Sequence, residues 1–209
     1  IETRVIGCLV EKQLTTPEYY PLTLNALVAA CNQKTNREPV VNYDEKTVEQ
    51  ALDSLRDKNL VYVFYGSSSR VPKYKHMLPS VYELSPPEVA VISVLMLRGA
   101  QTLGELNQRT NRLYEFSGLN EINETLEGLI KRDEPLVIKL ERQTGQKEAR
   151  YAHLLSGEID MEALANMRET SGGQTRNDRI AELEREIENL RNELNSFRQE
   201  FEQFKKQFE

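Results

Sequence analysis

The sequence predicts a mainly helical α+β protein in which one compact pattern occurs twice and a long C-terminal helix follows. Three observations carry this prediction. The two halves of residues 1–155 share aligned motifs, each half ends in a strand–turn–strand segment, and apolar residues in 179–209 recur at steps of three and four. The 209 residues, with 39% hydrophobic and 29% charged content, suffice for one large or two small packed domains.

Each strand–turn–strand segment carries the same motif on its second strand. Residues 59–78 read NLVYVFYGSSSRVPKYKHML, and residues 135–155 read PLVIKLERQTGQKEARYAHLL. A shift of 77 residues places the pattern Tyr-x-His-x-Leu of 74–78 on that of 151–155. Because alternate residues of a strand share a face, the motif presents one inward face in both copies. It predicts two β-hairpins with basic residues on the opposite face.

Helical patterns precede each hairpin at matching positions. Apolar residues recur at helical spacing just before the two hairpins, and again at the start of each copy. Between them the segment Thr-Leu-x-x-Leu occurs twice, and each threonine can cap a short helix. The predicted inward residues are Val5, Cys8, Leu9, Val48, Leu52, Leu55, Val89, Ile92, Met96, Ile122, Leu126 and Leu129, and the predicted N-caps are Thr23, Asp44, Thr102 and Asn120.

Three helices followed by a hairpin are the arrangement of a winged-helix domain, a helix-turn-helix with a β wing. About 70 to 80 residues are enough for the core that such elements share. We therefore predict tandem winged-helix domains at residues 1–84 and 85–155, a linker at 156–178 and a coiled-coil helix at 179–209.

Three segments also resemble the YceH family of bacterial proteins. They are RVIGCLVEKQLTTPEYYPLTLNALVAACNQKTNREPV at 4–40, EVAVISVLMLRGAQTLGEL at 88–106 and LYEFSGLNEINETLEGL at 113–129. The resemblance covers nearly the whole chain and is loosest in the tail. It implies tandem winged-helix domains, and it brings no particular biochemical activity with it.

The tail predicts a dimer. Its apolar residues occupy positions a and d of four uninterrupted heptads, which is typical of a coiled coil. A parallel pair joins opposite charges at all four g-to-e contacts, whereas an antiparallel pair sets like charges together, so we expect a parallel homodimer. Phenylalanine fills four consecutive core positions, and the alternative is that this stripe packs against the chain's own domains. The predicted dimerisation residues are Ile180, Leu183, Ile187, Leu190, Leu194, Phe197, Phe201, Phe204 and Phe208.

The formal charge of −6 is unevenly spread. Residues 1–155 carry 19 basic against 20 acidic side chains, and residues 156–209 carry 8 against 13. A near-neutral body neither demands nor excludes a polyanionic partner. The longest apolar stretch, residues 89–97, falls far short of the roughly 20 residues that cross a bilayer. With no recognisable signal peptide, we expect a cytoplasmic protein without a membrane partner, with Cys8 and Cys31 as buried, reduced thiols.

No motif for catalysis or metal binding occurs in the sequence. It contains no phosphate loop, nucleotide-binding glycine motif or nucleophile–base arrangement. Cys8 and Cys31 lack the spacing of metal ligands. His76 and His153 fall on the inward strand face and are interpreted as core residues. We therefore predict a non-enzymatic protein with no cofactor and no metal.

Basic residues on the two hairpins predict contact with DNA. Lysine and arginine on a wing neutralise phosphates and release counterions, which gives salt-dependent affinity. We predict a dimeric, DNA-associated regulatory protein. The predicted phosphate contacts are Arg70, Lys73, Lys75, Lys147 and Arg150, with Lys34 and Arg37 as secondary candidates.

Two other interpretations of the same residues stay open. The third helices are acidic, with a net charge of −2 over residues 44–58 and −1 over residues 119–132. That charge favours a protein–protein interaction scaffold, which would use these helices and the coiled coil without binding DNA. The hairpin bases can also be the solvated edge of a sheet, where lysine prevents aggregation.

Overall fold

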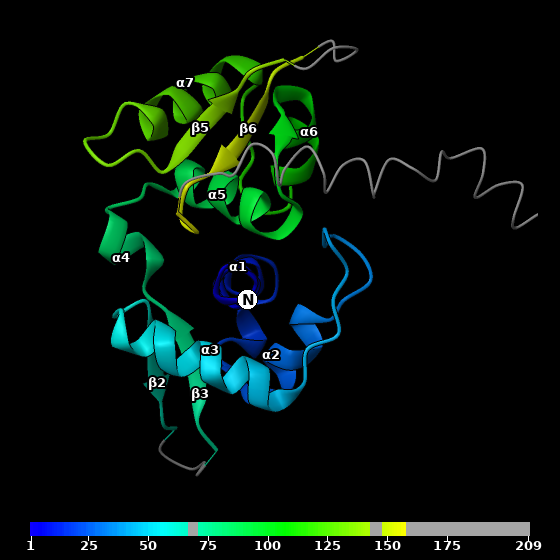
Figure 1. Ribbon diagram of the computed structural model, residues 1–209, viewed down its shortest axis with the longest axis vertical. Coiled ribbons are helices and arrows are strands. Elements are labelled where there is room, and N and C mark those ends of the chain that lie inside the picture. The colour runs from blue at the N-terminus through cyan, green and yellow to red at the C-terminus, as the bar shows by residue number, and fades with distance from the viewer. Residues whose placement is uncertain (67–70, 143–147, 158–209) are drawn as a thin grey trace, which may run out of the picture. The chain divides into compact units, whose positions relative to one another are not determined.

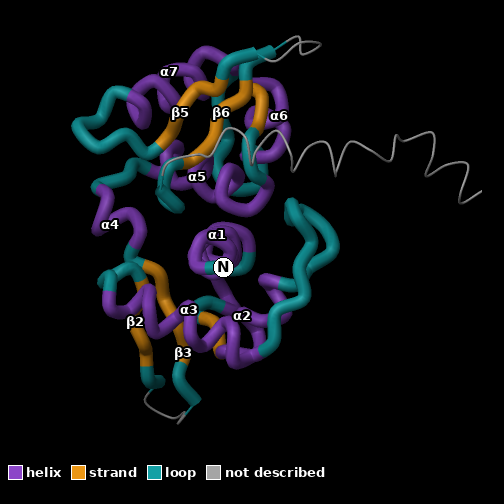
Figure 2. Tube along the Cα trace, in the orientation of Figure 1, coloured by secondary structure: helices purple, strands orange, loops and turns teal. Residues whose placement is uncertain are grey.

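The computed structural model of the protein describes residues 1–66, 71–142 and 148–157, which belong to one compact unit spanning residues 1–158. The described residues are mainly helical and of α+β class, with seven α-helices and two three-stranded antiparallel sheets (Figures 1 and 2). The predicted linker lies outside the described residues apart from its first two positions, and the predicted coiled coil lies outside them entirely.

The helices and strands have the following bounds. The helices are α1 (Glu2–Thr15), the 3-10 helix η1 (Pro17–Tyr19), α2 (Leu24–Cys31), α3 (Glu45–Asp57), α4 (Leu78–Tyr82), α5 (Pro86–Arg98), α6 (Leu103–Thr110) and α7 (Leu119–Ile130). The strands are β1 (Leu22–Thr23), β2 (Val61–Phe64), β3 (Lys73–His76), β4 (Gln101–Thr102), β5 (Val137–Leu140) and β6 (Arg150–His153).

The two halves of the unit use the same element order. Helix, short strand, helix, helix and hairpin occur as α1, β1, α2, α3 and β2–β3, and again as α5, β4, α6, α7 and β5–β6. The strand orders are β1-β3-β2 and β4-β6-β5, so the second hairpin strand is central in both sheets. Tyr74 and Tyr151, which the repeated motif aligns, each pair with a short strand on one side and a hairpin partner on the other.

Three of the four predicted N-caps are confirmed. The side chains of Thr23 and Thr102 accept hydrogen bonds from the backbone N–H groups of Ala26 and Glu105, and Asp44 caps α3 in the same way. These bonds satisfy backbone donors that the first turn of a helix leaves unpaired.

The fourth predicted N-cap, Asn120, is wrong. Helix α7 begins at Leu119, after Gly118, so Asn120 lies inside its first turn. The start is fixed by Glu121, whose carboxylate accepts hydrogen bonds from the Ser117 backbone N–H at 2.7 Å and hydroxyl at 2.9 Å. Because a side chain reaches back from the helix, an asparagine cap is not needed.

Helix α5 is buried over its whole middle. Residues 89–97 are all buried, because α5 packs against α1 of the first half and against α6 and α7 of its own half. Figure 1 shows α1 end-on between α5 and the helices α2 and α3. A helix covered on opposite sides is apolar all round, which accounts for the long apolar run in the sequence. No helix in the described part of the chain is long and apolar enough to span a membrane.

The predicted core is confirmed at most helical positions. All twelve inward residues named above are buried. Of the leucines in the two Thr-Leu-x-x-Leu segments, which are also expected to face inward, Leu27 and Leu106 are buried and Leu24 and Leu103 are half-buried against the core. Cys31 is buried as well, and both cysteines are free thiols, as expected. The Cys8 thiol donates to the Ala30 carbonyl oxygen over 3.3 Å.

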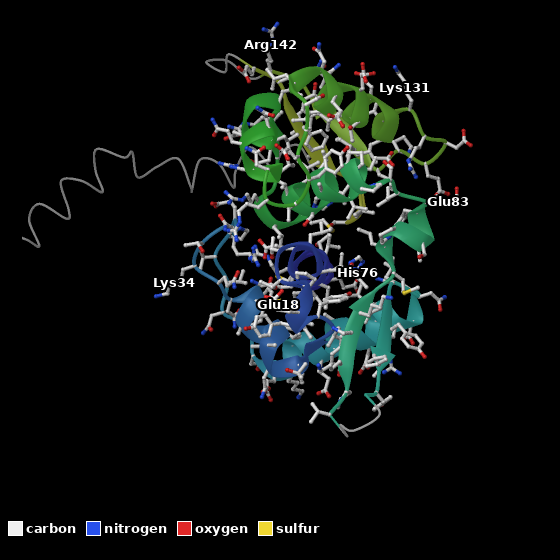
Figure 3. All side chains as sticks on the ribbon, turned by 180° about the vertical axis from the view of Figure 1, so that it is seen from behind. Glu18, Lys34, His76, Glu83, Lys131 and Arg142 are labelled. Carbon is white, nitrogen blue, oxygen red and sulfur yellow. The ribbon has the colours of Figure 1, made fainter. Side chains whose placement is uncertain are left out.

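Both histidines face inward, as the strand alternation predicts. His76 is 3% exposed, and neither of its ring nitrogens has a hydrogen-bond partner among the described residues. Figure 3 marks it at the inner end of β3, the strand that packs against α1. Burial lowers the pKa of His76 to about 4, and the charge of Lys75 adds to this effect. Burial also lowers the pKa of His153 to about 4.

These low pKa values predict a loss of stability in mild acid. An unfolded histidine titrates near 6.5, so below that pH the unfolded chain binds a proton that the folded chain rejects until about pH 4. Each histidine should therefore lower the free energy of unfolding by about 1.4 kcal/mol per pH unit within this window. We expect His76→Phe to halve that slope between about pH 6.5 and 5, measured by urea denaturation. An unchanged slope would show that His76 is not protonated on unfolding in this range.

Candidate nucleic-acid interface

The outer face of the first hairpin joins two aromatic and two basic side chains. On β2, Tyr62 pairs with Lys75 and Phe64 pairs with Lys73 on β3. Tyr62 is 62% exposed and Phe64 45% exposed. Lys75 is exposed and Lys73 half-buried. We call these four residues the first hairpin face.

The inner face of the same hairpin packs into the core. Val61, Tyr74 and His76 are buried there, as alternation along a strand requires. The predicted inward face is therefore confirmed, and the bases lie on the opposite face. The aromatic residues of that opposite face were not among the predicted site residues, although the alternation Tyr-Val-Phe in β2 is the signal that could have found them.

The second hairpin has a different outer face. Ile138, Leu140, Arg150 and Ala152 occupy the positions of Tyr62, Phe64, Lys73 and Lys75. Leu140 and Ala152 are buried, at 5% and 7% exposure. On the described strands of this hairpin, the outer face therefore has no exposed aromatic ring, and Arg150 is its one base.

Arg150, a predicted phosphate contact, is engaged within the protein. Its guanidinium donates to the Glu105 carboxylate at 2.8 Å and to the Ala100 carbonyl oxygen at 2.8 Å. Burial acts to raise the pKa of Glu105, but the backbone N–H of Thr102 and the charge of Arg150 lower it below its ordinary value. The opposite charges of Arg150 and Glu105 therefore largely cancel each other.

One residue explains why Arg150 of the second hairpin has a carboxylate partner at a position where Lys73 of the first has none. Glu105 lies three residues after the cap of α6, and the same place after the cap of α2 is occupied by Ala26. The strand partners are also equivalent, because Thr102 pairs with Arg150 and Thr23 pairs with Lys73. Alanine carries no charge, so it gives Lys73 no carboxylate partner at this position. The equivalent Arg150 is paired with Glu105.

The prediction that Arg37 is a secondary phosphate contact has to be corrected. Its side chain is fully buried, and it donates to the Glu11 carboxylate at 2.6 and 3.1 Å and to the Ala30 carbonyl oxygen at 3.1 Å. A guanidinium that is enclosed and hydrogen-bonded in this way cannot reach a phosphate. It anchors the segment between α2 and α3 to α1, because the charge needs a partner in the interior.

Of the other three predicted phosphate contacts, Lys34 alone lies within the described residues. Lys34 projects from the segment between α2 and α3, as Figure 3 shows, and is not part of the hairpin. Arg70 and Lys147 lie outside the described residues, as do all nine predicted dimerisation residues.

Helix α3, the third helix of the first half, presents acids to the solvent. Glu45, Glu49 and Asp53 are exposed. Arg56 offsets one of them, with a guanidinium nitrogen 3.1 Å from the Asp53 carboxylate. The exposed surface of this helix is therefore unfavourable for a groove lined by phosphates.

Comparison with known proteins gives consistent matches over most of the chain. Residues 1–146 match the family model described as "Protein of unknown function, DUF480". A UPF0502 protein of Pelobacter propionicus is 51% identical over 193 residues, which cover 90% of this chain and 88% of that protein. A UPF0502 protein of Opitutus terrae is 56% identical over 162 residues, covering 77% and 70%. One of Geobacter sulfurreducens is 47% identical over 194 residues, covering 91% and 88%.

These relatives are bacterial, and the matches span the three segments on which the family resemblance was based. The resemblance is thereby confirmed, and the chain belongs to the DUF480 family of UPF0502 proteins.

Proposed function

We propose that the protein is a non-enzymatic, DNA-associated regulatory protein with two tandem winged-helix domains, and that it contacts DNA through the first hairpin face. The observation that carries the proposal is the pairing of exposed Tyr62 and Phe64 with Lys75 and Lys73 on neighbouring strands. The repeated order of helix, strand, helix, helix and hairpin supports the winged-helix assignment.

The chemistry of this face suits nucleic acid. Lysine ammonium groups neutralise phosphates and release counterions, which supplies affinity without sequence preference. Exposed aromatic rings add stacking against bases or contact with sugars wherever bases are accessible. Large aromatic rings are costly to leave in water, so two of them on one strand face favour a binding surface.

Contact with DNA through the hairpin also agrees with the acidic surface of α3. A recognition helix with three exposed acids is poorly suited to base-specific contacts in the major groove. Phosphate contacts position a protein on DNA and carry no sequence information directly. The proposed binding is therefore led by the hairpin and weakly specific.

A dimer would present two first hairpin faces to one duplex. The predicted parallel coiled coil of residues 179–209 would join two chains, and linked sites bind far more tightly than single ones. Light scattering on the full chain and on residues 1–170 tests this part of the proposal. A dimeric mass for the first and a monomeric mass for the second are expected, whereas two monomeric masses would contradict it.

Binding to labelled duplex and single-stranded DNA tests the function, with fluorescence anisotropy as the measurement. We expect a dissociation constant tighter than about 10 µM at low salt, and weaker binding as salt rises. The double variant Lys73→Gln/Lys75→Gln should reduce the slope of log K against log salt by up to about 1.8 on duplex, or about 0.9 for each phosphate that is no longer neutralised. Phe64→Ala should weaken single-strand binding by about 1–3 kcal/mol for one stacked base.

Lys46→Gln/Lys131→Gln is the matched control. It also removes two lysine charges, from the exposed start of α3 and from a residue next to α7 whose side chain is 73% exposed. Neither lysine belongs to the first hairpin face, so the salt slope should be unchanged. Equal effects of the two double variants would mean that only net charge matters.

The acidic surface of α3 favours a second candidate function, a protein-interaction scaffold. Glu45, Glu49 and Asp53 form an exposed acidic row, which suits a basic protein partner. Absence of salt-sensitive binding to either form of DNA at about 10 µM would reject the first proposal and leave the scaffold as the better one.

A further inference from the structure

A second basic surface lies in a cavity between the two halves of the compact unit. The cavity has a volume of about 550 Å3, and its walls come from the ends of α1, α5 and α6 and from the segment after α2. We call it the basic cavity. The charged residues that line it are Lys12, Lys34, Arg98, Arg109, Arg112 and a single carboxylate, Glu11.

The carboxylate in this cavity is already matched by a base outside the lining. Glu11 accepts both of its short hydrogen bonds from Arg37, at 2.6 and 3.1 Å. Among the lining bases, the Lys12 ammonium lies 4.0 Å from the Glu11 carboxylate, and Arg109 lies 3.7 Å from that of Glu105. Lys34, Arg98 and Arg112 have no carboxylate oxygen within 4.0 Å among the residues that the structure describes.

The helix dipoles offset only part of the positive charge in the basic cavity. Lys12, Arg98 and Arg109 lie in the last turns of α1, α5 and α6, where a cation offsets roughly half a negative charge from the helix dipole. Lys34 and Arg112 lie outside the helices and have no such role. The cavity therefore keeps an excess of positive charge.

The positive charge of the cavity acts on Arg98, one of its half-buried bases. Burial lowers the pKa of Arg98, and the neighbouring charge of Arg109 lowers it further. Like charges held together in a partly enclosed space repel each other, and an anion placed between them would relieve this repulsion.

The walls of the cavity are fixed before any ligand binds. The backbone N–H of Glu38 donates to the Leu97 carbonyl oxygen at 2.9 Å, which ties the segment after α2 to the end of α5. The guanidinium of Arg98 donates to the side-chain oxygen of Asn36 across the same gap. Arg37 holds this segment to α1. A preformed site avoids the entropy cost of ordering its walls.

The remaining lining suits a ligand with more than phosphates. Val94, Leu97 and Leu113 supply an apolar part, and the amides of Gln33 and Gln108 supply donors and acceptors. A volume of this size is typical of small-molecule sites, which combine an apolar surface with a few polar groups.

We propose that the basic cavity binds an organic phosphate of nucleotide size, with its phosphates among Lys34, Arg98 and Arg112. The site is distinct from the first hairpin face and does not depend on the proposed DNA contact. Because its walls come from both halves of the unit, a bound ligand bridges them and raises the temperature of unfolding.

Calorimetric titration of the full chain with ATP, AMP and adenosine tests the proposal, together with thermal unfolding. We expect affinity to follow the number of phosphates, and ATP to raise the Tm more than adenosine. Lys34→Gln/Arg112→Gln should weaken ATP binding by about tenfold or more, because it removes two charge-assisted hydrogen bonds to the phosphates. Both side chains lack hydrogen bonds within the described residues, so this variant should fold normally. Equal affinity for ATP and adenosine, or no binding of ATP at about 1 mM, would overturn the proposal.

Lys46→Gln/Arg56→Gln is the matched control. It removes one lysine and one arginine from α3, and neither of them lines the cavity. ATP binding by this variant should equal that of the unaltered chain. If it lost as much ATP affinity as the cavity variant, the loss would depend on net charge alone.

DNA binding separates the two proposals. Lys73→Gln/Lys75→Gln should leave ATP binding intact, and Lys34→Gln/Arg112→Gln should leave the salt slope on duplex DNA intact. If the cavity variant instead abolished duplex binding and ATP competed with the duplex, the cavity would hold the DNA backbone. The small-ligand proposal would then be wrong.

Discussion

Replacing Arg37 with methionine is expected to lower the free energy of unfolding by about 3–5 kcal/mol. The guanidinium is fully enclosed and joins Glu11, Ala30 and Asn36 through hydrogen bonds of 2.6 to 3.1 Å. Methionine fills similar volume but leaves the Glu11 carboxylate and the Ala30 carbonyl oxygen without their donor. Urea denaturation of the full chain, followed by circular dichroism, measures the change.

Lys12→Met is the matched control for this prediction. Lys12 also lies beside Glu11, but its ammonium group is 4.0 Å from the carboxylate and its side chain is 21% exposed. A partly solvated ion pair of this kind contributes about 0–1 kcal/mol, so the control should lose little stability. The double variant Glu11→Gln/Arg37→Met should recover part of the loss because the unpaired charge is gone. Equal effects of Arg37→Met and Lys12→Met would show that the buried pair is not needed.

Gly7→Leu is expected to lower the free energy of unfolding by about 3 kcal/mol. Gly7 lies where α1 meets α5, and a Cβ atom there would be 3.0 Å from Leu97 Cδ2 and 3.2 Å from Met96 Cβ. A leucine side chain has no space at this contact, so the two helices must move apart. Thermal and urea unfolding measure the loss, and the packing between the two halves of the unit should weaken with it.

Gly128→Ala provides the matched control on α7. A Cβ atom at Gly128 meets only the Glu88 Oε1 atom, at 3.9 Å. Alanine is favoured over glycine in a helix by about 0.5–1 kcal/mol, so this variant should be slightly more stable. Stability of the Gly7→Leu variant close to that of the unaltered chain would contradict the close helix approach.

Much of the fold followed from local patterns. The spacing of Leu52 and Leu55 on one helix, the capping threonines and the repeated Tyr-x-His motif identified helices, their starts and inward strand faces. Such features depend on residues a few positions apart in the chain, because near neighbours determine both side-chain periodicity and helix-cap hydrogen bonds. The prediction for Asn120 was wrong because α7 begins earlier, after Gly118, where Glu121 accepts a hydrogen bond from the Ser117 backbone N–H.

The candidate site was predicted less well, and the reason is again physical. Charge can be counted in a sequence, but whether a charge is free depends on what folds against it. Arg37 and Arg150 looked like surface bases until Glu11 and Glu105, from distant segments, were placed beside them. The five bases of the basic cavity come from four separate segments, so no local pattern connects them.

The sequence by itself determined an α+β chain whose first 155 residues use one element order twice, because periodicity, caps and strand alternation are short-range properties. It also determined the uneven charge, with the acids concentrated in the tail. Only the tertiary structure decided which bases stay available. Burial and ion pairing depend on contacts between residues far apart in the chain. One difference, Ala26 in the first half where the second has Glu105, leaves Lys73 without the carboxylate partner that Arg150 has.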